Sequence, residues 1–138
     1  MSRSAEIDIN WADGTYRFAL KWGELAELQE KTDAGPYVVL QRLHSGAWRI
    51  EDVSNTIRLG LIGGGMKPDE ALKKVRYYVE ARPPMESVPY AIGILSAGLL
   101  GASDEKLGEA EGEATEVKST TSPTEKSDTQ PSTEPEPS

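Results

Sequence analysis

The strongest constraint on the fold is a period-two alternation of apolar and polar residues near the start of the chain, in EIDINWADGTYRFAL. The apolar positions are Ile7, Ile9 and Trp11 before an Asp-Gly pair, and Tyr16, Phe18 and Leu20 after it. Alternation on both sides of Asp-Gly predicts a β-hairpin with one apolar face, over about residues 6–20. An isolated hairpin is not stable in water, so this face must pack against the rest of the chain.

Helical periodicity follows the hairpin, from about residue 22 to residue 102. The expected inward positions are Trp22, Leu25 and Leu28, then Val39, Leu40 and Leu43, then Val53, Ile57 and Leu61, then Leu72, Val75 and Val79, and last Ile92, Leu95 and Leu99. We expect Gly35 and Gly46 to end the first two helices, and Asp52 or Ser54 to cap the third. The sequence therefore predicts an α+β, mostly helical fold, with an N-terminal hairpin and four or five short helices in a single domain over residues 1–102.

Composition changes sharply after residue 102. Residues 103–138 hold 3 Lys and Arg against 10 Asp and Glu, which accounts for −7 of the net charge of −8. This segment has no aromatic residue and contains four prolines. Because it cannot bury enough apolar surface to offset the entropy of ordering its backbone, we expect residues 103–138 to form a disordered acidic tail. A solubilising role is the simplest interpretation, and a partner-binding role is the alternative.

The most conspicuous local motif is the glycine-rich run GLIGGGMKP, which begins at Gly60. It resembles a phosphate-binding loop, but methionine separates the glycines from Lys67, and Pro68 stands where that loop has a hydroxyl residue. Such a loop also follows a buried strand, whereas the preceding residues have helical spacing. The sequence therefore favours a turn between two helices. The residues of this turn are Gly63, Gly64, Gly65 and Pro68.

The sequence offers little for catalysis or metal binding. The chain has no cysteine and one histidine, His44, so a zinc site would depend almost entirely on carboxylates. Ser45 and Ser54 lie near His44 in sequence, but neither occupies a nucleophile-elbow motif, and catalytic triads are defined by geometry rather than spacing. We expect no catalytic residues, no cofactor and no metal, and hence a protein that is not an enzyme.

Charge and hydropathy bear on partners and location. A nearly neutral folded part with an acidic tail is a poor electrostatic partner for nucleic acid. The longest apolar stretch, YAIGILSAGLLGA, is too short to span a bilayer. The N-terminal residues lack the apolar core of a signal peptide, so we expect a cytoplasmic protein without a membrane partner.

The chain has three tryptophans, Trp11, Trp22 and Trp48, which are its main aromatic candidates for a binding contact. Core packing is the simplest interpretation of each. Trp48 follows a predicted helix end and is the one most expected to be partly exposed. Since tryptophan is a frequent interface anchor, Trp48 is the leading candidate for a partner contact.

Several segments taken in order resemble the gene transfer agent family of phage tail assembly chaperones. The segments are EIDINWADGTYRFAL, LAELQEKTDAGPYVVLQRL, GAWRIEDVSNTIRLGLIGGGMKPDEA and VPYAIGILSAGLLG. The resemblance covers about residues 6–102, and its most specific part is the run from Asp52 to Ala71. It implies a non-catalytic assembly factor that binds the tape measure protein, recruits tail tube subunits and is absent from the finished particle.

On this resemblance, the hairpin (Trp11, Tyr16 and Phe18) or the face near Trp48 would contact the partner. The protein would act in the cytoplasm of a bacterial host cell. The sequence leaves the oligomeric state open, including a homo-oligomer. Three other classes stay open. They are a structural tail protein retained in the particle, a small regulatory protein-binding module, and a phosphate-binding enzyme.

Overall fold

The predicted hairpin is present, as strands β2 (Glu6–Trp11) and β3 (Gly14–Ala19). The structure is a computed structural model that describes residues 3–103. The expected disordered tail, apart from its first residue, lies outside the described residues. The antiparallel register pairs Ile9 with Tyr16 and Trp11 with Gly14.

The hairpin loop differs by one position from the Asp-Gly turn that the sequence favours. Trp11 pairs with Gly14, so the two-residue loop is Ala12-Asp13 and Gly14 already belongs to the strand. Ala12 adopts a φ of 57°, in the left-handed region that non-glycine residues rarely occupy. A positive φ at the first loop position suits a two-residue hairpin.

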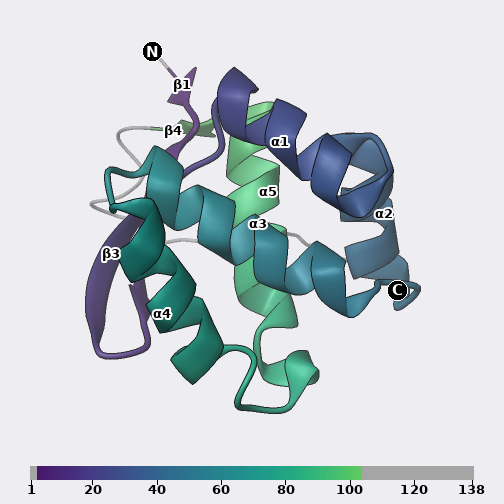
Figure 1. The fold of residues 1–138 in the computed structure, drawn as a ribbon. Helices are drawn as coiled ribbons and strands as arrows, with labels where there is room; N and C mark the ends of the chain where they lie inside the picture. Colours follow the sequence, from purple (N-terminus) through teal and green to yellow (C-terminus); the bar gives the residue numbers. More distant parts are fainter. Residues whose placement is uncertain (1–2, 104–138) are drawn as a thin grey trace, which may run out of the picture. The chain divides into compact units, whose positions relative to one another are not determined.

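Five α-helices follow, in agreement with the predicted fold class (Figure 1). They are α1 (Trp22–Thr32), α2 (Pro36–Ser45), α3 (Ile50–Gly63), α4 (Pro68–Tyr78) and α5 (Val88–Leu100), with a short 3₁₀ helix, η1 (Pro84–Glu86), before α5. Two further strands, β1 (Arg3–Ser4) and β4 (Ala102–Ser103), pair with each other.

Helix α3 is the centre of the packing. It contacts β3 and each of the other four α-helices, and Figure 1 shows it crossing the middle of the fold in front of α5. Its inward stripe of Val53, Ile57 and Leu61 is buried as the spacing predicts. Phe18 from the hairpin and Leu95 from α5 complete the same apolar cluster. The apolar face of the hairpin is therefore stabilised by helices that come much later in the sequence.

Two of the predicted helix signals are wrong. Helix α1 ends at Thr32 and is closed by Asp33, which takes the left-handed conformation at φ 56°, whereas Gly35 is the N-cap of α2. Helix α3 starts after Arg49, and Asp52 stands at the third helical position instead of at the cap. There its carboxylate accepts the Arg49 backbone N–H at 2.9 Å, which satisfies a donor that the helix itself leaves without a partner.

The inward faces of α1 and α5 also differ from prediction. Trp22 is 90% exposed, while Leu28 is fully buried. Positions three apart on a helix drift by about 60° per step, so residues six apart do not share a face. In α5 the fully buried side chains are Ala91, Ile94 and Leu95, whereas Ile92 and Leu99 are only partly buried.

Candidate functional site

Two of the hairpin residues expected to contact a partner belong to the core. Phe18 is fully buried, and Trp11 is 5% exposed with its ring against those of Phe18, Tyr16 and Tyr78. The apolar face of the hairpin packs on the helices and is not available to a docking partner. A partner contact through Trp11 and Phe18 stays a prediction, and the burial of both side chains in the core does not support it.

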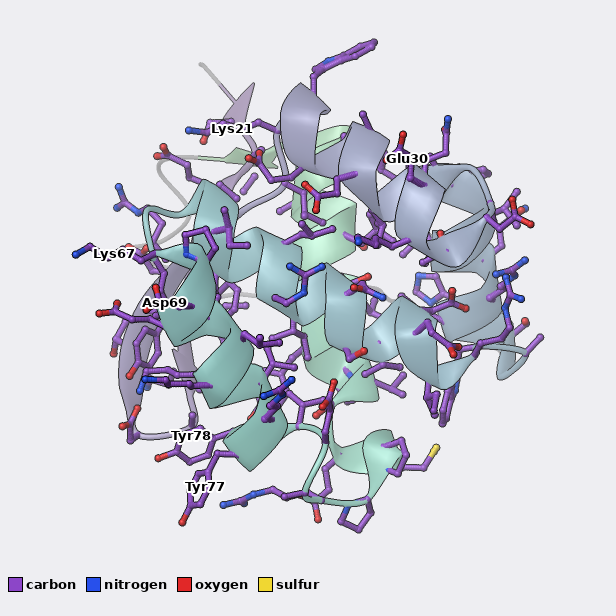
Figure 2. All side chains as sticks on the ribbon, viewed as in Figure 1. Lys21, Glu30, Lys67, Asp69, Tyr77 and Tyr78 are labelled. Atoms are coloured by element: carbon purple, nitrogen blue, oxygen red, sulfur yellow. The ribbon has the colours of Figure 1, made fainter. Side chains whose placement is uncertain are left out.

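Tyr16 is half-buried and takes part in a polar and aromatic cluster at the hairpin tip. Its hydroxyl donates to the Asp13 carboxylate, and the Lys74 ammonium lies 3.4 Å from the same carboxylate. The Lys74 ammonium is also 5.2 Å from the centre of the Tyr16 ring and 5.7 Å from that of Tyr78, which Figure 2 labels at the end of α4. The cluster fixes the hairpin tip against α4.

The ionisable groups of this cluster respond to one another. The hydrogen bond from Tyr16 lowers the pKa of Asp13, and Lys74 lowers it further. Partial desolvation raises the pKa of Tyr78, and the nearby charge of Asp13 acts in the same direction. These shifts follow from mutual contacts that hold two elements together.

Trp48 lies between α2 and α3, in the segment that follows the left-handed Gly46. It is half-buried and packs against the core cluster. Nearby, the buried Asp52 carboxylate receives the Arg42 guanidinium at 3.3 Å. The Arg49 guanidinium donates to the Thr32 carbonyl at 2.6 Å. Trp48 therefore precedes a residue, Arg49, whose backbone and side chain are both hydrogen-bonded, and it presents only part of its ring to solvent.

The glycine run forms the end of α3 and the turn to α4. Gly63 is the last residue of α3, Gly64 and Gly65 follow it, and Pro68 is the first residue of α4. Gly65 has a φ of 115°, which favours glycine. A Cβ on Gly64 would lie 2.0 Å from the Arg17 carbonyl oxygen, so the turn packs directly on the backbone of β3. A helix precedes the run instead of a strand, and the glycines serve packing rather than phosphate binding.

The most exposed apolar surface lies elsewhere, over α1, α2 and the end of α5. Trp22 and Tyr37 are 90% and 62% exposed and stand at a groove of about 430 Å³. The groove is lined by Trp22, Leu25, Ala26, Gln29, Pro36, Tyr37 and Leu99. Only Gln29 among these has a polar side chain besides the hydroxyl of Tyr37 and the indole N–H of Trp22. We call this feature the apolar groove.

A second groove, of about 510 Å³, lies between the start of α3 and the segment that joins α4 to η1. Its lining includes Ile50 and Val79, but also Glu51, Glu80 and Arg82. Its mixed charge makes it less suited than the apolar groove to hold an apolar segment.

Sequence reasoning missed the apolar groove. It placed Trp22 inside the fold and did not consider Tyr37. The only local signal was the position of each residue, since Trp22 and Tyr37 are the first and second residues of their helices and lie off the stripe that contains Leu28 or Leu40.

The arrangement can hold an apolar side chain or a helix, and it offers no assembled metal site. Within residues 3–103, no three His, Asp or Glu side chains are grouped so that they could hold a metal ion. None of the helices in the same part of the chain has the length and apolar composition needed to cross a bilayer. His44 is exposed in the last turn of α2, where a helix end favours positive charge.

A family model described as "Phage tail tube protein, GTA-gp10" matches residues 4–101, which is nearly all of the described part of the chain. The chain therefore belongs to this family of phage and gene transfer agent tail proteins. No curated protein and no solved structure matches the sequence.

Proposed function

We propose that this chain is a non-enzymatic tail assembly chaperone that acts in the cytoplasm of the bacterial host. In this role it binds the tape measure protein and recruits tail tube subunits to it. Membership of a tail protein family supports a role in tail formation. The resemblance of the ordered segments to tail assembly chaperones supports the more specific role.

The observation that carries the proposal is the apolar groove. Trp22 and Tyr37 are large, solvent-exposed aromatic side chains beside a concave surface made by Leu25, Pro36 and Leu99. Exposed aromatic anchors beside a groove are typical of sites that take the apolar face of a partner helix. A partner helix would cover this surface and keep its own apolar stripe from aggregating.

The test is co-expression of the tagged chain with the tape measure and tail tube proteins, followed by pull-down. We expect the wild-type chain to keep the tape measure protein soluble. The double variant Trp22→Ala, Tyr37→Ala should lose most of this binding. Tyr77→Ala is the matched control, because Tyr77 is similarly exposed at 66% but lies on α4. If the double variant bound the tape measure protein as well as Tyr77→Ala does, the apolar groove would be excluded as the contact.

A structural tail protein is the second candidate, favoured by the family description itself. The two functions differ in where the chain ends up. Mass spectrometry of purified particles would find a structural subunit in fixed proportion to the other tail proteins. An assembly chaperone would be absent from particles while present in the lysate.

A further inference from the structure

A small cavity is formed where the hairpin loop meets the end of α4 and the start of α5. It has a volume of about 270 Å³ and shares no residue with the apolar groove. Pockets that hold drug-sized ligands measure roughly 300–1,000 Å³, so this cavity fits a single small group. Its lining is chiefly Trp11, Tyr78, Arg82, Glu86, Ser87 and Tyr90.

Ser87 is the unusual member of this lining. Residues 3–103 contain four buried polar or charged residues, of which Thr32, Asp52 and Thr56 are hydrogen-bonded. Ser87 is only 3% exposed, and its hydroxyl has no hydrogen-bond partner in the described part of the chain. Because a buried polar group without a partner is costly, nearly all such groups in native proteins bond to protein, water or a ligand.

The backbone explains why this hydroxyl is left over. Ser87 directly precedes α5, at the position where serine normally accepts a hydrogen bond from the first turn of the helix. Its φ of −92° and ψ of −14° are helical instead of extended, and its side chain does not cap. The first N–H groups of α5 therefore gain no bond from Ser87, and the positive end of the helix dipole favours a negative charge here.

Two further donors in the lining have no acceptor. Trp11 is 5% exposed, and within residues 3–103 its indole N–H has no hydrogen-bond partner. The Arg82 guanidinium lies 5.5 Å from the centre of the Tyr78 ring, and it forms no ion pair with any described residue. Glu86 is the only carboxylate in the lining and is exposed. The cavity thus combines a hydroxyl, an indole N–H and a guanidinium, so a complementary ligand must supply acceptors.

We infer that this cavity binds a carboxylate carried on an apolar stem. Carboxylate oxygens can accept several hydrogen bonds at once and match the planar fork of an arginine. The rings of Trp11, Tyr78 and Tyr90 provide apolar walls for the stem. Glu86 disfavours a phosphate group, which carries up to two negative charges, more than a singly charged carboxylate. The inference does not depend on the tape measure protein being the partner of the apolar groove.

NMR on the full-length, nitrogen-15-labelled chain tests the inference. The probe is 3-phenylpropanoate, and 3-phenylpropanamide is its neutral control of nearly the same shape. We expect the indole N–H signal of Trp11 to shift with the acid and not with the amide. The indole signals of Trp22 and Trp48, which do not line the cavity, should stay in place.

A second probe distinguishes the two sources of a carboxylate. It is a peptide with both ends blocked, whose single carboxylate belongs to a Glu side chain. A shift of Trp11 at lower concentrations of this peptide than of 3-phenylpropanoate would support the site and assign the carboxylate to a partner protein. A shift with 3-phenylpropanoate alone would support the site and assign the carboxylate to a small molecule.

Variants identify the groups that hold the carboxylate. Ser87→Ala and Arg82→Gln should each weaken binding about tenfold, since each removes a hydrogen bond to a charged group. Ser96→Ala on α5 and Arg76→Gln on α4 are the matched controls, because neither residue lines the cavity, and they should bind normally. Glu86→Gln should tighten binding by removing a like charge.

Thermal unfolding of Ser87→Ala separates binding from a structural role. Because the hydroxyl has no partner in the described part of the chain, its removal should leave Tm unchanged or raise it. A clear drop in Tm would show that the hydroxyl supports the fold and would overturn its role in binding. Equal shifts with the acid and the amide would overturn recognition of a carboxylate. If no probe shifted Trp11, the cavity would hold water only, and the site itself would be overturned.

Discussion

Gly63 is seated on the backbone of Ala19. A Cβ atom added to Gly63 would lie 1.7 Å from the Ala19 carbonyl oxygen, far inside any van der Waals contact. A Cβ on Gly60 would lie 3.2 Å from the Phe18 ring in β3 and 2.9 Å from Ile94 in α5, and a Cβ on Gly98 would lie 2.9 Å from the side chain of Leu20, just after β3. The packing of the hairpin on α3 and α5 thus depends on the absence of a Cβ at these glycines.

Gly63→Ala should destabilise the fold by about 3 kcal/mol or more, because the new methyl group meets backbone that cannot move without disrupting β3. Urea unfolding followed by far-UV circular dichroism measures the change. Gly93→Ala is the control, since a Cβ there meets nothing within 4 Å and the site is inside α5. It should stabilise by about 0.5–1 kcal/mol. A similar loss in both variants would show that close packing is not the cause.

Asp52→Ala should lower the free energy of unfolding by about 3–5 kcal/mol. The carboxylate is fully buried and accepts from the Arg42 guanidinium and the Arg49 backbone, so its removal leaves a partly buried cation and a helix start without partners. Asp69→Ala provides the comparison, because Asp69 stands in the first turn of α4 but is exposed. Its loss should cost no more than about 1 kcal/mol. Equal costs would argue against a structural role of the buried pair.

The pKa of Asp8 lies below its usual value, chiefly because the Arg17 side chain donates a hydrogen bond to its carboxylate. A lowered folded-state pKa means that this contact stabilises the fold above the unfolded-state pKa, which is about 3.9. The contribution disappears as the pH falls through the folded-state pKa. Because the pair is exposed, the effect on stability should not exceed about 0.5 kcal/mol.

A carbon-13 NMR titration of the side-chain carboxylates tests this assignment. In Arg17→Gln the midpoint of Asp8 should rise, whereas that of Asp13, which depends on Tyr16 and Lys74, should stay lowered. Parallel movement of both midpoints would point to a general charge effect instead of a specific pair.

The tryptophans should respond very differently to truncation. Trp11→Ala removes a buried ring that packs on Phe18 and Tyr78, and should cost about 3–5 kcal/mol. Trp22→Ala removes an exposed ring and should change the stability by less than about 0.5 kcal/mol. Thermal unfolding of the two variants beside the wild type is sufficient to compare them. A large loss in Trp22→Ala would mean that its ring supports the fold, which would weaken its assignment to the apolar groove.

The features that sequence predicted were local. The period-two alternation around Trp11 gave the hairpin, and the spacing of Val53, Ile57 and Leu61 gave the inward face of α3. The left-handed end of α2 at Gly46 followed from the same kind of signal. In each case a periodicity or a backbone preference within one segment decides the outcome.

The features that sequence missed arise between segments. Asp33 closes α1 and Pro36 starts the next helix three residues later, a boundary that no residue within α1 reveals. Position 63 needs a glycine because the backbone of Ala19, which is far away in sequence, leaves no room for a Cβ. The apolar groove needs α1, α2 and the end of α5 together, so neither Trp22 nor Tyr37 signals it alone.

The packing of β3 against α3 and α5 has a consequence for synthesis of the chain. The hairpin is the first of the longer elements to be made, yet Gly60 and Gly98, on which Phe18 and Leu20 rest, are translated much later. Contacts between residues so distant in sequence form slowly, and until they form, the apolar face of the nascent hairpin has nothing to cover it. The apolar face of the hairpin is therefore fully covered only after both α3 and α5 have been synthesised.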